Sequence, residues 1–116
     1  MCTGGEHLMN IKHEIKDKVL IISIEGELIS PQALDTDKKI IALIEKEKKE
    51  RVILDLSKVD FIDSTGLGIL VSIKLYCKKN KILFATVGVN EKIKRTFTVT
   101  EMSSFLNIHD SIDKLL

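Results

Sequence analysis

The sequence predicts a single α/β domain with a mixed, mostly parallel sheet of about five strands, preceded by a β-hairpin, and about four helices packed on the sheet. Three observations support this prediction. The chain has 116 residues, the length of one domain. Apolar residues make up 44% of it, which is enough to form a core. After the hairpin, apolar runs alternate with helical patterns, which is typical of parallel strands joined by right-handed crossovers.

The hairpin occupies the first part of the predicted domain. From Ile11 to Ile15, apolar and polar residues mostly alternate, which predicts a half-buried strand. Asp17-Lys18 suits a tight turn, and the apolar run VLIISIEGEL predicts a second strand that ends near Leu28. Residues 1–9 show no periodicity, and we expect them to be a flexible N-terminus.

The next element is predicted to be a helix over residues 31–49. Ser30 suits the N-cap, and Pro31 suits the first helical position. The expected buried stripe consists of Leu34, Ile41 and Ile44. The charged run EKEKKER, residues 45–51, is expected to be a solvated end rather than a binding site.

A buried strand and a buried helix are predicted to flank the segment DFIDSTGLG, residues 60–68. Val52 to Leu56 is an almost continuous aliphatic run, typical of a central strand covered on both faces. After the segment, a helix that is apolar nearly all round is expected to end near Asn80, with these apolar residues: Leu67, Ile69, Leu70, Val71, Ile73 and Leu75.

The last third of the chain predicts a strand, a helix, a short strand and a final turn. ILFATVGV, residues 82–89, has the pattern of a buried strand, and Asn90 suits the N-cap of a helix that buries Ile93 and Phe97. The remaining expected elements are a short strand with Phe105, Leu106 and Ile108, and a turn capped by Asp110 or Ser111 that holds Ile112, Leu115 and Leu116.

Several functional classes are disfavoured by composition and motifs. The net charge of +1 argues against a nucleic-acid binder, and no apolar run is long enough to span a membrane or to form a signal peptide. We expect a cytoplasmic protein whose thiols, Cys2 and Cys77, are reduced. His7, His13 and His109 lack metal-ligand spacing, so neither a metal nor a cofactor is expected.

The segment DFIDSTGLG has two interpretations from its residues alone. Ser64, Thr65 and Asp63 are residue types that start a helix, so the segment can be a plain cap. It also lies at the carboxyl end of a strand and at a helix N-terminus, where backbone N–H groups favour an anion and where Gly66 and Gly68 leave the backbone bare. Asp63 is favoured as the cap.

An enzyme is the weaker interpretation of the same segment. Gly66-x-Gly68 lacks the third glycine of a dinucleotide fingerprint, and the chain has no complete phosphate-binding loop. No histidine stands in a recognisable base position relative to Ser64. Asp60 and Asp63 remain conceivable as a carboxylate pair in a small enzyme or nucleotide-binding protein.

The segment KVDFIDSTGLGILVSIKLYCK resembles the signature of the STAS-domain family, and most closely that of bacterial anti-sigma factor antagonists. The resemblance extends over residues 10–116. Gly26-Glu27-Leu28 resembles an early family segment, and residues 89–97 resemble a later family helix.

The resemblance implies a phosphorylation switch rather than a catalyst. It implies phosphorylation of Ser64, or less readily Thr65, by an anti-sigma factor that is a serine kinase, and resetting by a PP2C-type phosphatase. The unphosphorylated protein would bind the anti-sigma factor and release the sigma factor. The implied partner-binding residues are Asp60, Asp63, Ser64, Thr65, Gly66, Leu67 and Gly68.

Two departures from the family pattern keep an alternative open. Ile29 stands where such proteins commonly carry an aspartate, and Thr100-Glu101-Met102 replaces a Thr-Gly-Leu. The alternative is a constitutive docking subunit, stressosome-like or transporter-associated, that binds a partner without a phosphorylation cycle.

Overall fold

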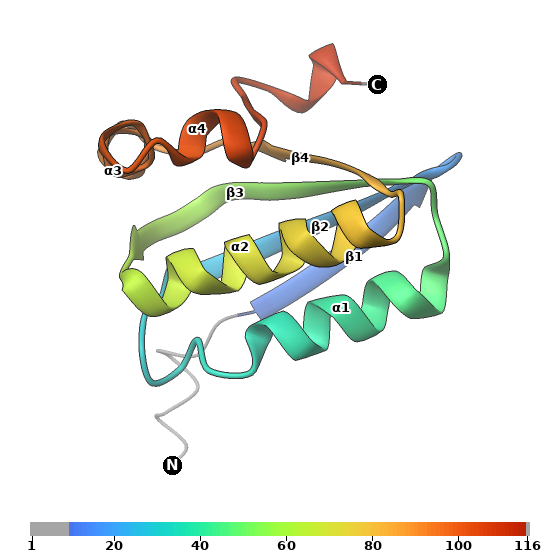
Figure 1. Ribbon diagram of the computed structural model, residues 1–116, viewed down its shortest axis with the longest axis horizontal. Helices are drawn as coiled ribbons and strands as arrows, with labels where there is room; N and C mark the ends of the chain where they lie inside the picture. The colour runs from blue at the N-terminus through green and yellow to red at the C-terminus, as the bar shows by residue number, and fades with distance from the viewer. Residues whose placement is uncertain (1–9, 116) are drawn as a thin grey trace.

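The computed structural model describes residues 10–115, so the expected flexible segment 1–9 and Leu116 lie outside the described residues. Five strands form one sheet in the order β1-β2-β3-β4-β5; β1 is antiparallel to β2, and the other pairs are parallel. This confirms the predicted fold class (Figure 1). The strands are β1 (Asn10–Lys16), β2 (Val19–Leu28), β3 (Arg51–Ile62), β4 (Leu83–Val87) and β5 (Ile108–His109).

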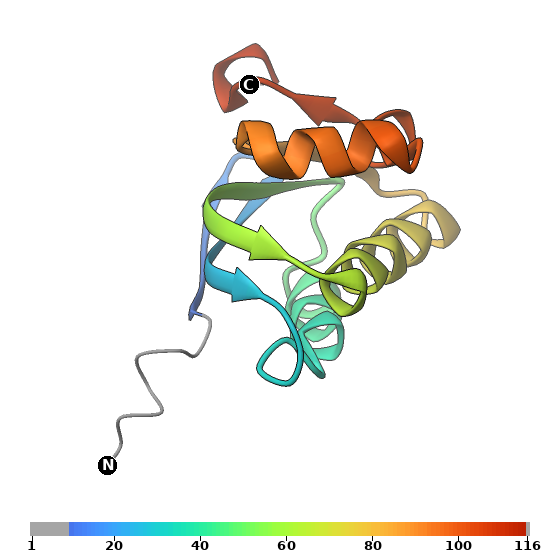
Figure 2. The same cartoon turned by 90° about the vertical axis from the view of Figure 1, so that its left-hand side faces the viewer.

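Helices α1 and α2 lie side by side on one face of the sheet (Figures 1 and 2). The main core forms where their buried residues meet those of β2, β3 and β4, and α3 adds Ile93 and Phe97 to it. The helical elements are α1 (Thr36–Glu47), α2 (Ser64–Lys79), α3 (Glu91–Val99), α4 (Met102–Phe105) and the 3-10 turn η2 (Ile112–Lys114).

The opposite face of the sheet carries a smaller apolar cluster that the C-terminal segment covers. Ile112 and Leu115 pack there against buried residues of β2, β3 and β4, such as Ile53. Arg51 donates a hydrogen bond from Nη2 to the backbone oxygen of Leu115 at 2.7 Å. This contact ties the end of the described chain to the start of β3.

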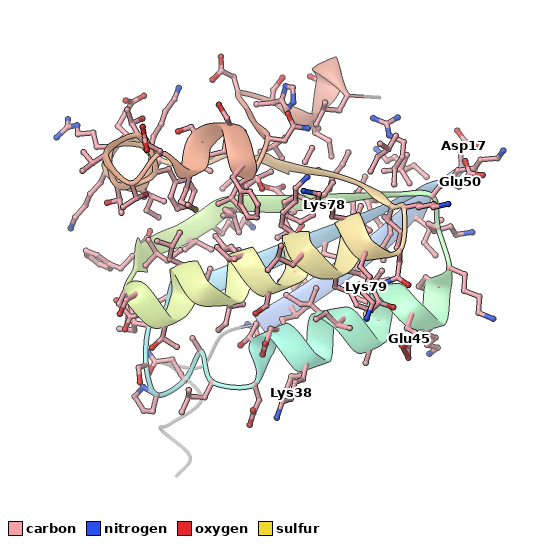
Figure 3. All side chains as sticks on the ribbon, in the orientation of Figure 1. Asp17, Lys38, Glu45, Glu50, Lys78 and Lys79 are labelled. Carbon is pink, nitrogen blue, oxygen red and sulfur yellow. The ribbon has the colours of Figure 1, made fainter. Side chains whose placement is uncertain are left out.

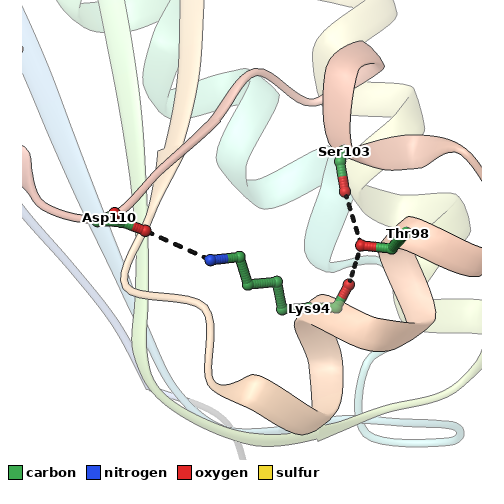
Figure 4. A network of polar contacts seen from close by, with 4 residues as sticks. All are labelled: Lys94, Thr98, Ser103 and Asp110. Carbon is green, nitrogen blue, oxygen red and sulfur yellow. Dashed lines mark hydrogen bonds and ion pairs between the residues drawn. The ribbon is translucent and has the colours of Figure 1, made fainter.

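Polar contacts join the last helices to the segment after β5 (Figure 4). The Lys94 ammonium lies 3.4 Å from the Asp110 carboxylate. The Thr98 hydroxyl donates to the Lys94 carbonyl at 3.0 Å and lies 3.5 Å from the Ser103 hydroxyl. Each contact is exposed and therefore weak, but together they connect α3, α4 and the C-terminal segment.

The predicted start of the first helix is wrong. The helix begins at Thr36, and residues 30–35 form successive turns instead. Asp35, at φ 69°, has a left-handed backbone that separates these turns from α1. The buried stripe is also different, because Leu34 is 56% exposed and Ile41 only partly buried, while Ile40 and Ile44 enter the core.

Two further boundaries and the burial of one helix differ from the prediction. Strand β3 continues to Ile62 rather than ending near Leu56. Helix α2 is not apolar all round, since Leu75 is half exposed. Phe105 ends the short helix α4 instead of starting a strand, because the Leu106 N–H donates to the Met102 carbonyl and continues the helical turn.

Other local predictions are confirmed. The hairpin strands and the end of α2 at Asn80 lie where the pattern places them. The Asn90 side chain caps α3 by accepting a hydrogen bond from the Ile93 N–H at 2.8 Å. Ser111 stands at the N-cap position of η2, and Ile112 and Leu115 are partly buried.

Candidate functional site

The segment DFIDSTGLG lies at the carboxyl end of β3 and runs directly into α2 (Figure 1). Residues 60–62 are still part of β3, Asp63 is the N-cap, and Ser64 is the first residue of α2. Leu28, the last residue of β2, pairs with Ile62. The segment is therefore built where two neighbouring parallel strands end, which is where α/β sheets commonly bind ligands and partners.

Asp63 ties together three segments of the chain. Its Oδ1 accepts a hydrogen bond from the Gly66 N–H at 3.0 Å, which caps α2 as the sequence predicts. Its Oδ2 accepts one from the Ser30 N–H at 2.9 Å, and its own N–H donates to the Leu28 carbonyl at 3.2 Å. The two N–H donors, Ser30 first and then Gly66, lower the pKa of the Asp63 carboxyl.

These hydrogen bonds predict an acid-sensitive contribution to stability. Because the pKa of folded Asp63 is lowered from 3.8, its carboxylate stabilises the fold fully above that value, and this contribution is lost as the pH falls toward the lowered pKa. We expect Asp63→Asn to lower the Tm at neutral pH by about 5 °C. We also expect the Tm of this variant to fall less on acidification than that of the unmodified protein.

Circular dichroism melting curves at a series of pH values would measure both effects. Asp60→Asn is the matched control, since it removes an exposed carboxylate of the same segment. If acid lowers the Tm of Asp63→Asn as much as that of the unmodified protein, Asp63 is not the source of the pH dependence.

Ser64 is exposed and does not cap the helix. Because Asp63 provides the cap, the Ser64 side chain is not needed for it, and its hydroxyl forms no hydrogen bond with any residue that the structure describes. Thr65 is half-buried. The plain-cap interpretation of the segment is therefore correct for Asp63 but does not account for the Ser64 hydroxyl.

The two glycines of the segment have different surroundings. Gly66 is buried, and a Cβ there would come within 2.7 Å of Ile62 Cγ1 and 2.9 Å of Leu28 Cβ, and closer still to the Leu28 carbonyl oxygen. A Cβ on the exposed Gly68 would meet nothing within 4 Å. Gly66 therefore lets the chain's own β2 approach α2, and only Gly68 leaves an open surface.

The remaining predicted site residues also differ in exposure. Asp60 is exposed, whereas Leu67 is partly buried and packs against the main core. The seven predicted residues lie together at the end of β3 and the start of α2. Of these seven, only Asp60, Ser64 and Gly68 are exposed to another molecule.

The structure adds two neighbours that the sequence prediction missed. The Asn90 side-chain amide donates to the carbonyl oxygens of Val59 and Asp60, both at 3.3 Å, so the start of α3 is held against the end of β3. Phe61 is 44% exposed, with the Lys92 ammonium 4.2 Å from its ring centroid. An aromatic residue within the polar segment 60–68, in a chain with only four Phe and one Tyr, was the signal available in the sequence.

Ile29, a departure from the expected family pattern, lies next to this site. It directly precedes Ser30, is half-buried, and its carbonyl accepts a hydrogen bond from the Ala33 N–H at 2.9 Å. The structure thus places this departure from the family pattern beside the Ser30–Asp63 hydrogen bond.

Residues 10–115 offer neither a metal site nor a membrane span. No group of three His, Cys, Asp or Glu residues has the arrangement of a metal site, and no helix is long and apolar enough to cross a membrane. Cys77 is a free, buried thiol, and burial raises its pKa to about 11, which disfavours the reactive thiolate.

Comparison with known proteins gives a match over nearly the whole chain. The model of the STAS domain family matches residues 10–115. A protein of Thermotoga maritima named as a "putative anti-sigma factor antagonist" is 29% identical over 104 residues, 90% of this chain and 92% of that protein. The anti-sigma-B factor antagonist of Staphylococcus aureus is 24% identical over 106 residues, 90% of this chain and 96% of that protein.

Solved structures agree with these matches. A crystal structure of a Thermotoga maritima protein with the same name is 27% identical, with a TM-score of 0.79 over 90% of each chain. The antagonist SpoIIAA shares the fold in its unphosphorylated form, with 15% identity and a TM-score of 0.74 over 91% of each chain. Its phosphorylated Bacillus form has 16% identity and a TM-score of 0.69 over 92% of this chain and all of that one.

Proposed function

This chain belongs to the STAS domain family, and from that premise we propose that it is a phosphorylation-switched anti-sigma factor antagonist. The unphosphorylated form binds an anti-sigma factor that is also a serine kinase, and so releases the sigma factor. Phosphorylation of Ser64 ends this binding, and a PP2C-type phosphatase restores it. The protein acts in the cytoplasm as a binding module rather than as an enzyme.

The observation that carries this proposal is the exposed Ser64 hydroxyl at the start of α2. A kinase must reach its acceptor, and Ser64 is exposed while Thr65 is half-buried. The hydroxyl is also free of the structural role that would otherwise explain a serine there, because Asp63 caps the helix. Modifying Ser64 therefore removes no hydrogen bond made by its side chain among the described residues.

The proposed contact surface is the segment 60–68, whose exposed residues are Asp60, Phe61, Ser64 and Gly68. Gly66 and Asp63 hold this segment in position. Gly66 packs closely against Leu28, and the Asp63 carboxylate accepts two backbone hydrogen bonds. The exposed Phe61 ring gives the same surface an apolar anchor, a residue type enriched at protein interfaces.

The charge of a phosphate explains how binding could be switched without refolding. Phosphorylation adds roughly −1.5 to −2 charges and three acceptor oxygens. The free N–H groups at the α2 N-terminus tolerate this charge locally. In an interface, the phosphate must lose water, and it adds negative charge to a segment that already carries the Asp60 and Asp63 carboxylates. A loss of about 2.7 kcal/mol weakens binding roughly a hundredfold.

The relatives support the same proposal. Both curated relatives described above are named for antagonism of an anti-sigma factor and match about nine-tenths of the chain. SpoIIAA, which shares this fold, has been solved in phosphorylated and unphosphorylated forms.

One observation favours a second candidate function. Ile29 brings an apolar side chain to the position next to Ser30 where similar proteins commonly carry an aspartate, and this position borders the Ser64 segment through Asp63. If the kinase needs that carboxylate, the chain would be a constitutive docking subunit that binds its partner whether or not ATP is present.

Intact-mass measurement followed by peptide mapping would separate the two functions. The protein is incubated with ATP and a kinase-type anti-sigma factor encoded in the same genome. We expect one added phosphate, located on Ser64. Tight binding in a pull-down without any added phosphate would favour the docking subunit, and a phosphate on Thr65 instead would move the switch by one residue.

A further inference from the structure

A cleft of about 760 Å³ opens at the end of the sheet that is remote from Ser64. Arg51 and Leu83, the first residues of β3 and β4, line it, whereas Ser64 follows the last residue of β3. The full length of β3 therefore separates the cleft from the proposed switch. The volume lies within the usual range for binding pockets.

The charges around the cleft are all positive. Arg51, Lys74, Lys78 and Lys81 line it, and no Asp or Glu is among the lining residues. None of the four takes part in the ion pairs found among residues 10–115, and Arg51 instead donates to the Leu115 carbonyl. Since the whole chain carries a net charge of only +1, this is a local concentration of unpaired cations.

The floor of the cleft is apolar and partly open to water. Leu83 is 67% exposed, unusual for a large apolar side chain in a strand. Phe84, the next residue of β4, points to the other face of the sheet, is only 4% exposed, and has the Lys74 ammonium 5.7 Å from its ring centroid. A ligand that binds here needs both an apolar group for this floor and negative charges for the lysines.

The sheet edge beside the cleft is also incomplete. Strand β5 pairs only with Thr86 and Val87, so in the described chain the first residues of β4, Leu83 to Ala85, have no strand beside them on that side. An open strand edge is a place where an extended peptide can add its own backbone hydrogen bonds. The Asn107 side-chain amide already donates to the Phe84 carbonyl at 3.0 Å, so only part of this edge is free. The exposed Leu83 side chain favours an amphipathic polypeptide over a small inorganic anion.

We propose that this cleft is a second docking site, which binds an acidic segment of a partner protein. One large apolar side chain of the segment packs on the exposed Leu83, while flanking carboxylates face Lys74, Lys78 and Lys81. Because the cleft is remote from Ser64, the two surfaces can be occupied together, and this site does not respond to phosphorylation of Ser64. The proposal does not depend on the proposed function.

Neighbouring lysines on α2 supply a matched pair of variants. Lys78 and Lys79 both lie in the last turn of α2, so their charges act equally on the helix end. Figure 3 shows that they diverge, Lys78 toward the strands and Lys79 toward α1, and only Lys78 lines the cleft. Lys78→Glu and Lys79→Glu change the net charge identically but change the cleft differently.

The probe is a fluorescein-labelled peptide with a Leu-Phe pair between two runs of Glu, and its binding is measured by fluorescence anisotropy. We expect Lys78→Glu to weaken binding about tenfold and Lys79→Glu to leave it almost unchanged. Leu83→Thr, which removes the large apolar side chain but introduces a residue type that favours strands, should also weaken binding. In two-dimensional NMR spectra, the amide signals that shift should come from the residues around the cleft.

Several results would overturn this proposal. Equal losses for Lys78→Glu and Lys79→Glu would mean unspecific attraction to a basic surface. Equal binding of a peptide with Ser-Ser in place of Leu-Phe, together with displacement by inorganic tripolyphosphate, would mean a site for small anions. Shifts confined to the signals of residues 60–68 would place the peptide on the other surface, as would loss of binding in Ser64→Glu.

Discussion

A Ser64→Ala variant is expected to bind the kinase-type anti-sigma factor as tightly as the unphosphorylated protein, and to stay bound when ATP is added. The unmodified protein should lose about a hundredfold in affinity under the same conditions, which corresponds to about 2.7 kcal/mol. The reason is that the variant lacks the only exposed hydroxyl of the segment 60–68, so no phosphate can enter the interface. Titration calorimetry with and without ATP would measure both affinities.

The stability of the same variant distinguishes a switch from a cap. A capping serine replaced by alanine costs about 1 kcal/mol. Because Asp63 already accepts the Gly66 N–H, we expect the loss for Ser64→Ala to be well below that value. Thr65→Ala is the matched control and should remain responsive to ATP. If ATP weakens the binding of Ser64→Ala as much as it weakens the binding of the unmodified protein, Ser64 is not the phosphate acceptor.

A Gly66→Ala variant is expected to be among the least stable substitutions in this segment, while Gly68→Ala should be more stable than the unmodified protein. The new Cβ at position 66 would clash with the Leu28 backbone and with Ile62, so β2 and α2 would have to separate. Forcing extra atoms into such a contact costs about 1–3 kcal/mol. Gly68 has free space, and alanine there raises helix stability by about 0.5–1 kcal/mol.

Urea unfolding of the two variants would measure their free energies of unfolding. We expect a decrease for Gly66→Ala and an increase for Gly68→Ala, although the two positions lie in the same turn of α2. Both substitutions replace glycine by alanine in α2, so each serves as the control for the other. If Gly66→Ala is as stable as the unmodified protein, the start of α2 does not pack against β2 as closely as described. If Gly68→Ala is destabilised, the space around Gly68 is occupied.

Local patterns in the sequence predicted the elements that depend on neighbouring residues. The alternation from Ile11 to Ile15 and the run that follows Asp17-Lys18 predicted the hairpin. Asn90 predicted the start of α3, and Asp63 the start of α2, since a side-chain cap bonds to a backbone group only three residues away. These interactions are encoded within a short stretch of chain.

The first helix shows where local signals are insufficient. Ser30 and Pro31 have the residue types of a helix start, yet the Ser30 N–H donates to Asp63, 33 residues away. Residues 30–35 instead form turns that bring Ala33 into the core and leave Leu34 exposed. A contact with a distant carboxylate, invisible to a local pattern, thus outweighed the capping preference.

The sequence by itself determined the order of strands and helices apart from the short helix α4, and it also determined the family resemblance and the segment that carries Ser64. Only the tertiary structure decided which residues of that segment are reachable, that Gly66 faces Leu28 while Gly68 faces open space, and that Arg51, Lys74, Lys78 and Lys81 surround one cleft. The physical reason is range. Periodicity and capping act over a few residues, whereas exposure, close packing and the gathering of charges depend on segments that meet only when the sheet and its helices have assembled.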